Sequence, residues 1–190
     1  MRFETRILTL IAFGAVVNIV AGQIVQWLRL PIFLDSIGTI LAAVLAGPIA
    51  GAATGLVGNL LRALVAGPVE AAFAPVAMVI GAVAGWLARA GFFRRGWLSA
   101  VAGVIISFAL TAVAIPIQIH LFGGVTGAGS DLVLLYLVHI GRTLLSSVAL
   151  TILGSNILDK VLSCLLVWQI VQRLPARLIV GFPALKYSRA

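Results

Sequence analysis

Charged residues are scarce in this chain of 190 residues. They make up 9% of it, whereas 62% of the residues are hydrophobic and the mean hydropathy is +1.20. A soluble domain of this length cannot bury so much apolar surface. Transmembrane helices tolerate glycine and proline better than soluble helices do, and the chain has 20 glycines and 7 prolines. The composition excludes a water-soluble fold and predicts an all-α, polytopic membrane protein.

The chain also lacks the residue patterns of several kinds of chemistry. The single cysteine, Cys164, allows no internal disulfide, and no His, Cys or carboxylate cluster has metal-site spacing. The two lysines, Lys160 and Lys186, do not follow glycine, so no phosphate-binding P-loop is present. His139 and Ser146 lie about two helical turns apart with no orienting acid in register. We therefore expect no enzyme, metal or cofactor, and any ATP-driven step would require partner subunits.

The basic residues predict a membrane topology rather than a nucleic-acid partner. The net charge is +8, from 13 basic and 5 acidic residues, and nine of the basic residues lie in three groups at the ends of the apolar runs. These nine are Arg2, Arg6, Arg89, Arg94, Arg95, Arg173, Arg177, Lys186 and Arg189. The grouping follows the positive-inside rule, whereas no basic face is interleaved with aromatic residues. We expect both termini to be cytoplasmic, a lipid bilayer around the chain, and no nucleic acid.

The apolar runs predict six transmembrane helices. Their expected ranges are 7–28, 32–46, 49–66, 73–90, 97–121 and 156–174. The first run has about 22 residues, or ~33 Å, which spans a ~30 Å hydrocarbon core and exceeds the apolar region of a signal peptide. An even number of crossings is needed if the three basic groups share one side of the membrane.

The apolar stretch 131–174 is too long for one straight transmembrane helix. Its 44 residues would extend ~66 Å, about twice the membrane thickness. Gly154-Ser155-Asn156 is the expected break, with Ser155 or Asn156 capping the last helix, and Asp131 is well placed to cap the helical segment after the glycine-rich loop. We expect an extra partial or in-plane helix over about 131–154 in the outer membrane half. A single tilted, kinked helix is the alternative.

Polar side chains gather on the expected outer side of the bundle. Ionisable groups inside a bilayer are costly and usually serve a function. The inner halves of the same helices carry almost no charge, which favours a pocket open to the outside over a continuous pore. The expected substrate-binding residues are Asp35, Asn59, Arg62, Gln118, His120, His139, Arg142, Asn156 and Asp159.

Structural roles are also open for these residues. Asp35 could cap the helix at 32–46, and Asp159 and Lys160 could be polar groups at the start of the last helix. Arg62 could pair with Glu70 or extend to the membrane surface. The histidines could be interfacial rather than solute-binding.

Small residues recur every four positions on three of the expected helices. The repeats are Gly14-Asn18-Gly22, Gly51-Gly55 with the adjoining Gly58, and Gly81-Gly85. Such faces let helix backbones approach closely inside a membrane. We expect the second and third repeats to pack within the bundle, whereas the first is equally suited to docking a separate membrane partner.

One stretch of the chain carries a family pattern. Leu34-Asp35-Ser36-Ile37-Gly38-Thr39 is followed by a Gly-Pro-x-x-Gly-x-x-x-Gly pattern over 47–55 and by Gly58-Asn59-Leu60. Phe73-Ala74-Pro75-Val76-Ala77 and Gly123-Gly124-Val125-Thr126-Gly127 extend the likeness along the chain. With these motifs the chain resembles the S component, the substrate-binding membrane subunit, of energy-coupling factor (ECF) vitamin transporters.

The resemblance implies a six-helix fold in a bacterial or archaeal cytoplasmic membrane, with a high-affinity pocket facing outward. It also implies a transmembrane coupling protein and two ATPase subunits as partners, whose ATP hydrolysis topples the S component and carries the pocket inward. The family's Ala-x-x-x-Ala docking face is approximated by Ala12, Gly14, Ala15 and Asn18, because Val16 stands four positions after Ala12.

The expected pocket residues offer both signs of charge, amide groups and few aromatic rings. This mixture fits a small heterocyclic vitamin or precursor better than a cobalamin-sized one. A ligand-sensing membrane domain and a small independent permease are the alternatives. A sensor should have a cytoplasmic output domain, and a permease should show internal repeats or polar residues on both sides of the midplane. We expect the uptake subunit.

Overall fold

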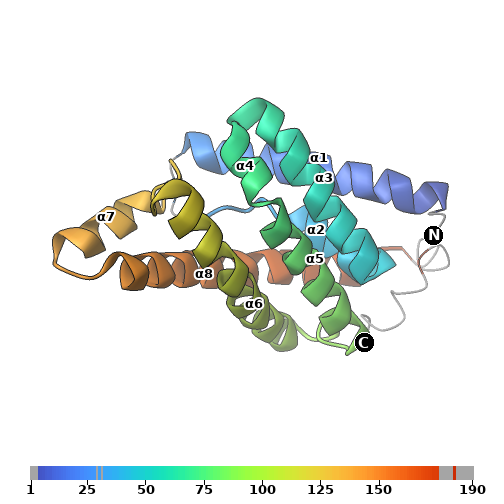
Figure 1. Cartoon of the computed structure of the whole chain (residues 1–190). Coiled ribbons are helices and arrows are strands. Elements are labelled where there is room, and N and C mark those ends of the chain that lie inside the picture. The colour runs from blue at the N-terminus through green and yellow to red at the C-terminus, as the bar shows by residue number, and fades with distance from the viewer. Residues whose placement is uncertain (1–3, 29, 31, 176–181, 183–190) are drawn as a thin grey trace.

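The computed structural model describes residues 4–28, 30, 32–175 and 182. Within these ranges the chain forms helices and no strand, which confirms the predicted all-α class for this part of the chain (Figure 1). The helices are α1 (Thr5–Trp27), α2 (Ile37–Ala46), α3 (Pro48–Ala66), α4 (Pro68–Ala72), α5 (Ala74–Arg89), α6 (Gly96–Phe122), α7 (Asp131–His139) and α8 (Leu144–Arg173). Of the basic residues used for the topology, Arg2, Arg177, Lys186 and Arg189 lie outside the described residues.

Four of these helices, α1, α3, α6 and α8, are long and apolar enough to cross a membrane. Two further apolar helices are shorter, with 10 residues in α2 and 16 in α5. At about 1.5 Å per residue these two measure ~15 Å and ~24 Å, less than a ~30 Å hydrocarbon core. Large apolar side chains are exposed along the outer faces, as at Phe13, Leu64 and Phe108. The chain is thus suited to a multi-pass membrane protein, and six crossings stay a prediction.

Helix α2 begins five residues later than the sequence predicts. The chain before it is not helical, and Leu34 has a positive φ of 48°. The Leu34 N–H donates a 2.7 Å hydrogen bond to Oδ1 of Asp159 in α8. Ser36 is the N-cap, without a side-chain capping bond, so the proposed capping role of Asp35 is wrong. This non-helical segment before α2 forms one wall of a cavity.

Helix α8 corrects the expected break near Gly154. It is continuous from Leu144 to Arg173, and the chain instead turns between α7 and α8, where Gly141 has a φ of 86°. A glycine inside a helix costs only about 1 kcal/mol, which packing readily offsets. Here Ser107 of α6 donates a 2.9 Å hydrogen bond to the Asn156 carbonyl oxygen. Both the predicted last helix at 156–174 and the single kinked helix are therefore wrong.

Close contacts between small residues hold the bundle together. A Cβ added to Gly51 would lie 2.7 Å from the Gly81 carbonyl oxygen, so α3 and α5 touch through their backbones. A Cβ on Gly103 would lie 2.6 Å from Cα of Val161, which places α6 equally close to α8. The predicted packing of the α3 and α5 repeats within the bundle is confirmed.

The small-residue face of α1 also packs inside the bundle. A Cβ on Gly14 would lie 2.8 Å from the Gly38 carbonyl oxygen, and Ala15 is fully buried. Asn18 donates to Thr39 Oγ1 at 2.7 Å and accepts from the Gly38 N–H at 2.7 Å. The prediction that Gly14, Ala15 and Asn18 dock a partner is therefore wrong, because α2 and α3 already occupy that face.

The two ends of the bundle differ in content. At one end the turn from α5 to α6 carries Arg94 and Arg95, and the fully buried Phe93 sits there against the last turns of α8. We call this the packed end. Figure 1 shows α7 projecting at the opposite end, where α6 ends and α8 begins. We call that the cavity end, because a pocket opens there.

Candidate solute-binding cavity

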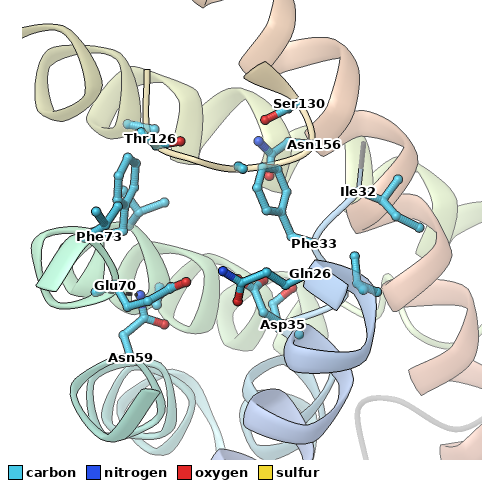
Figure 2. A pocket seen from close by; sticks show the side chains of 18 of the residues that line it. Gln26, Ile32, Phe33, Asp35, Asn59, Glu70, Phe73, Thr126, Ser130 and Asn156 are labelled. Atoms are coloured by element: carbon cyan, nitrogen blue, oxygen red, sulfur yellow. Dashed lines mark hydrogen bonds between the residues drawn. The ribbon is translucent and has the colours of Figure 1, made fainter. Parts of the chain in front are cut away.

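A cavity is enclosed by six helices and two connecting segments (Figure 2). The helices are α1, α3, α4, α5, α6 and α8, and the segments are those that precede α2 and α7. Its water-accessible volume is about 170 Å³, which is more than ten times what one water molecule needs. Phe33, Phe73 and aliphatic side chains form its apolar surface. Its polar lining comprises Gln26, Asp35, Ser36, Asn59, Arg62, Glu70, Gln118, Thr126, Ser130, Asn156 and Lys160.

Arg62 of α3 joins two carboxylates on the cavity wall. Its Nη1 lies 3.2 Å from Oδ2 of Asp35, and its Nη2 lies 3.2 Å from Oε1 of Glu70 in α4. Nη2 also donates to Oε1 of Gln26 at 3.4 Å. The guanidinium is buried, and its Nε is left without a hydrogen-bond partner. Planar, forked donors suit arginine to this bridging role.

Lys160 of α8 extends the same charge network. Its ammonium contacts the carboxylate of Asp159, lies 3.7 Å from Oδ1 of Asp35, and donates to Ser36 Oγ at 2.8 Å. Lys160 and Asp159 are almost completely inaccessible. The order of contacts is Glu70, Arg62, Asp35, Lys160 and Asp159, in which the charges alternate; we call these five residues the ionic chain.

Burial is offset by pairing for the two cations of the ionic chain, but it raises the pKa of Glu70 at the end of the chain. Every cation in it touches two carboxylates, which offsets the cost of removing charge from water. Glu70 ends the chain, and Arg62 is the only cation that contacts it among the described residues. Burial raises the pKa of Glu70 above its ordinary value, Arg62 lowers it in part, and Asp35 adds a smaller increase.

The loop before α7 forms another wall of the cavity. The Asp131 carboxylate accepts from the backbone N–H groups of Thr126 at 2.9 Å and Gly127 at 2.6 Å. Gln118 of α6 donates to the Gly124 carbonyl oxygen at 2.6 Å. Asp131 thus fixes the loop that precedes its helix, rather than acting as the N-cap, a position taken by Ser130. Two side chains, one from α6 and one from α7, therefore hold a glycine-rich loop over the pocket.

Two amide side chains of the lining have structural partners. Asn59 of α3 donates to the Glu70 carbonyl oxygen at 3.0 Å, which ties α4 to α3. Asn156 donates to the Ile152 carbonyl oxygen at 2.8 Å, one turn earlier in α8. Phe73 stacks on Phe122 with ring centroids 6.0 Å apart. These contacts fix the shape of the cavity.

The structure brings five of the nine expected binding residues to this cavity: Asp35, Asn59, Arg62, Gln118 and Asn156. Asp159 lies behind the wall, where it holds Lys160 and the Leu34 N–H. His120, His139 and Arg142 are exposed and do not line the cavity. The expectation that His139 lines the site is wrong, because α7 projects away from the bundle.

Several lining residues are absent from the expected binding residues. The sequence pattern gives Lys160 and Glu70 structural roles, and it assigns no binding role to Gln26 or to the 126–130 loop. Gln26 lies one helical turn after Gly22, whose position is pressed against Arg62. The four-residue spacing on α1 could therefore have predicted from the sequence that Gln26 lies near Arg62. Asp159 and Lys160 are in mid-helix, so their interpretation as helix-start groups is wrong.

Comparison with known proteins identifies no family. No protein-family model, no curated protein and no solved structure matches the chain.

Proposed function

We propose that the chain is a membrane subunit that captures a small heterocyclic vitamin or vitamin precursor from outside the cell for ATP-driven uptake. In this proposal it is the S component of an ECF-type transporter. A coupling protein and two ATPase subunits supply the energy, because the sequence holds no P-loop of its own. The cavity end faces outward, and both termini lie in the cytoplasm of a bacterium or archaeon.

The observation that carries the proposal is a buried ionic chain that lines a cavity at one end of an apolar bundle. Charges inside a membrane protein are costly and mark solute pathways. The opposite end is filled by side chains such as Phe93, Val167 and Val171, which have no exposed surface. A pocket closed at one end suits capture rather than free passage. The basic turn at the packed end would face the cytoplasm under the positive-inside rule.

The geometry also defines the parts of the capture step. Phe33 and Phe73 offer apolar surface for a ring, while Asp35, Arg62 and Glu70 offer polar contacts. The loop over the cavity is the natural entrance, because Gly123, Gly124 and Gly127 adopt positive φ values and a few hydrogen bonds hold the loop in place. Of the four predicted docking residues, Ala12 is the one exposed on the outer face of α1.

The first test is the identity of the bound solute and the requirement for partners. The purified protein should release a small heterocycle that mass spectrometry identifies. Co-expression with the ATPase and coupling subunits of the same cell should give a stable complex and ATP-dependent uptake into liposomes. Unaided transport by the isolated chain would contradict the partner requirement.

Two substitutions test whether the cavity is the binding site. Arg62→Gln should change the affinity for the copurified solute at least about tenfold, roughly 1.4 kcal/mol, because the carboxylates of Asp35 and Glu70 lose their shared cation. His139→Ala is the matched control outside the cavity and should bind as the wild type does. Isothermal titration calorimetry measures both. Unchanged affinity in Arg62→Gln together with a loss in His139→Ala would move the site to α7.

A further inference from the structure

The distribution of charge around the cavity contrasts with that of the whole chain. The chain has 13 basic and 5 acidic residues. Four of the five acidic residues surround the cavity: Asp35 and Glu70 line it, Asp159 holds Lys160 behind its wall, and Asp131 fixes its loop. Among the described basic residues, Arg62 and Lys160 line it. The formal charges of these four acidic and two basic residues sum to −2, whereas the whole chain carries +8.

The two signs of charge are also exposed differently. The Asp35 and Glu70 side chains keep 22% and 19% of their surface, whereas Arg62 keeps 8% and Lys160 1%. Each cation is already shared between two carboxylates. The two cations are thus paired and more deeply buried, and among the charged groups the carboxylates of Asp35 and Glu70 are the more exposed to a solute.

Glu70 is the member of the ionic chain with unused capacity. A carboxylate accepts up to about four hydrogen bonds, and Arg62 is the one side chain bonded to it among the described residues. Figure 2 shows the side chains of Glu70 and Gln26 pointing toward one another at the cavity. The raised pKa of Glu70 has burial as its main cause and agrees with a carboxylate that has too little positive charge near it.

We infer that the cavity selects a cationic solute, a small ring that carries a protonated amine or an equivalent positive group, and that Glu70 is its main counter-ion. This inference rests on the proposed function for the site itself, and it adds the charge class of the solute. A cation would bring the formal charge at the cavity closer to zero. The Phe33 and Phe73 rings add faces that attract a cation. An anionic solute would instead meet carboxylates, and the two cations that line the described part of the cavity, Arg62 and Lys160, are each already paired with two of these carboxylates.

Three probes with one shared ring test the charge preference. They are 3-(aminomethyl)pyridine, nicotinamide and nicotinate, which present a cation, a neutral amide and an anion at neutral pH. Dissociation constants are measured by saturation-transfer NMR on the full chain in lipid nanodiscs. We expect the amine to bind at least about tenfold more tightly than nicotinate, with nicotinamide between them.

The variant Glu70→Gln assigns the preference to one residue. Its amide oxygen still accepts from Arg62, so the fold is kept while one negative charge is removed. The ratio of amine to nicotinate affinity should fall at least about threefold, with His139→Ala as the unchanged control. An unchanged ratio in Glu70→Gln would overturn the assignment to Glu70.

The outcomes separate this inference from the proposed function. Nicotinate binding as tightly as the amine, or no measurable amine binding, overturns the inference and leaves ATP-dependent uptake to be judged by its own assay. Absence of a coupling partner would instead overturn the uptake role, while a measured cation preference would stand.

Discussion

The cavity end and the packed end are built from the same helices but stabilised by different forces. At the packed end, Phe93, Val167 and Val171 are fully buried against one another's helices, and apolar packing dominates. At the cavity end, buried Arg62 and Lys160 are held by carboxylates around a space that the side chains leave unfilled. Packing fixes one end tightly, while the other keeps polar groups ready for a solute.

Helix α8 shows the change along a single helix. Its buried positions run from Asn156, Asp159 and Lys160 at the cavity end to Val167 and Val171 at the packed end. These positions recur at helical spacing, so they form one continuous face. Charge on the first half of that face is tolerated because Asp35 and Ser36, just before α2, supply an opposite charge and a hydroxyl. The helix thus couples a binding wall to a rigid base.

Removal of the buried cation should have the largest effect on this contrast. Lys160→Met leaves the carboxylate of Asp159 buried without a cation and takes one partner from Asp35. Breaking a buried pair from one side typically costs about 3–5 kcal/mol. Thermal unfolding in detergent should show the loss, measured as the free energy of unfolding.

A double variant distinguishes lost charge balance from lost packing. Asp159→Asn in the Lys160→Met background removes the stranded charge and keeps an oxygen for the Leu34 N–H. Stability should recover in part, giving a coupling energy between the two sites. If the double variant loses as much free energy of unfolding as the two single variants together, the coupling energy between Asp159 and Lys160 is zero.

At the packed end, Phe93→Ala should cost about 3 kcal/mol, because it opens a hole in filled apolar space. Phe108→Ala is the matched control, since that ring is exposed on the outer face of α6 and should change stability by less than about 0.5 kcal/mol. Both variants should bind solute as the wild type does once folded. Weakened binding in Phe93→Ala would mean that the two ends are not independent.

The helical framework was largely predictable from the sequence, because apolar runs in a membrane protein are bounded by basic turns and Gly-Pro pairs. The expected 49–66, 73–90 and 97–121 agree with α3, α5 and α6 to within one residue at each end. Errors arose where tertiary contacts outweigh local signals. Gly154 predicts a helix break, but α8 packs against α6 and is continuous there. The apolar run predicts a helix from Ile32, but the backbone at Leu34 is not helical and its N–H bonds to Asp159.

The polar residues were found from the sequence, but their roles were not. Depth along each helix grouped Asp35, Asn59 and Arg62 correctly, since all three line the cavity. It also included His139, because the turn at Gly141 that directs α7 outward leaves no signature in hydropathy. The sequence pattern also places Lys160 at a helix start, because it does not show that the turn at Gly141 lets α8 begin at Leu144.

The smallest effect should appear in the pH dependence of stability, through Glu70 at the open end of the ionic chain. Burial raises the pKa of Glu70 above its ordinary 4.5, so the folded protein binds this proton more tightly than the unfolded chain does. Its contribution to stability is therefore full below pH 4.5 and is lost as the pH rises through the raised pKa. Unfolding midpoints of wild type and Glu70→Gln, compared from about pH 4 to about 8, should show the wild type losing stability relative to the variant. Glu4→Gln, an exposed position before α1, is the matched control and should follow the wild type. A wild type that gains stability relative to Glu70→Gln over this range would show that Arg62 outweighs burial, and that the cavity end satisfies its carboxylates without a bound cation.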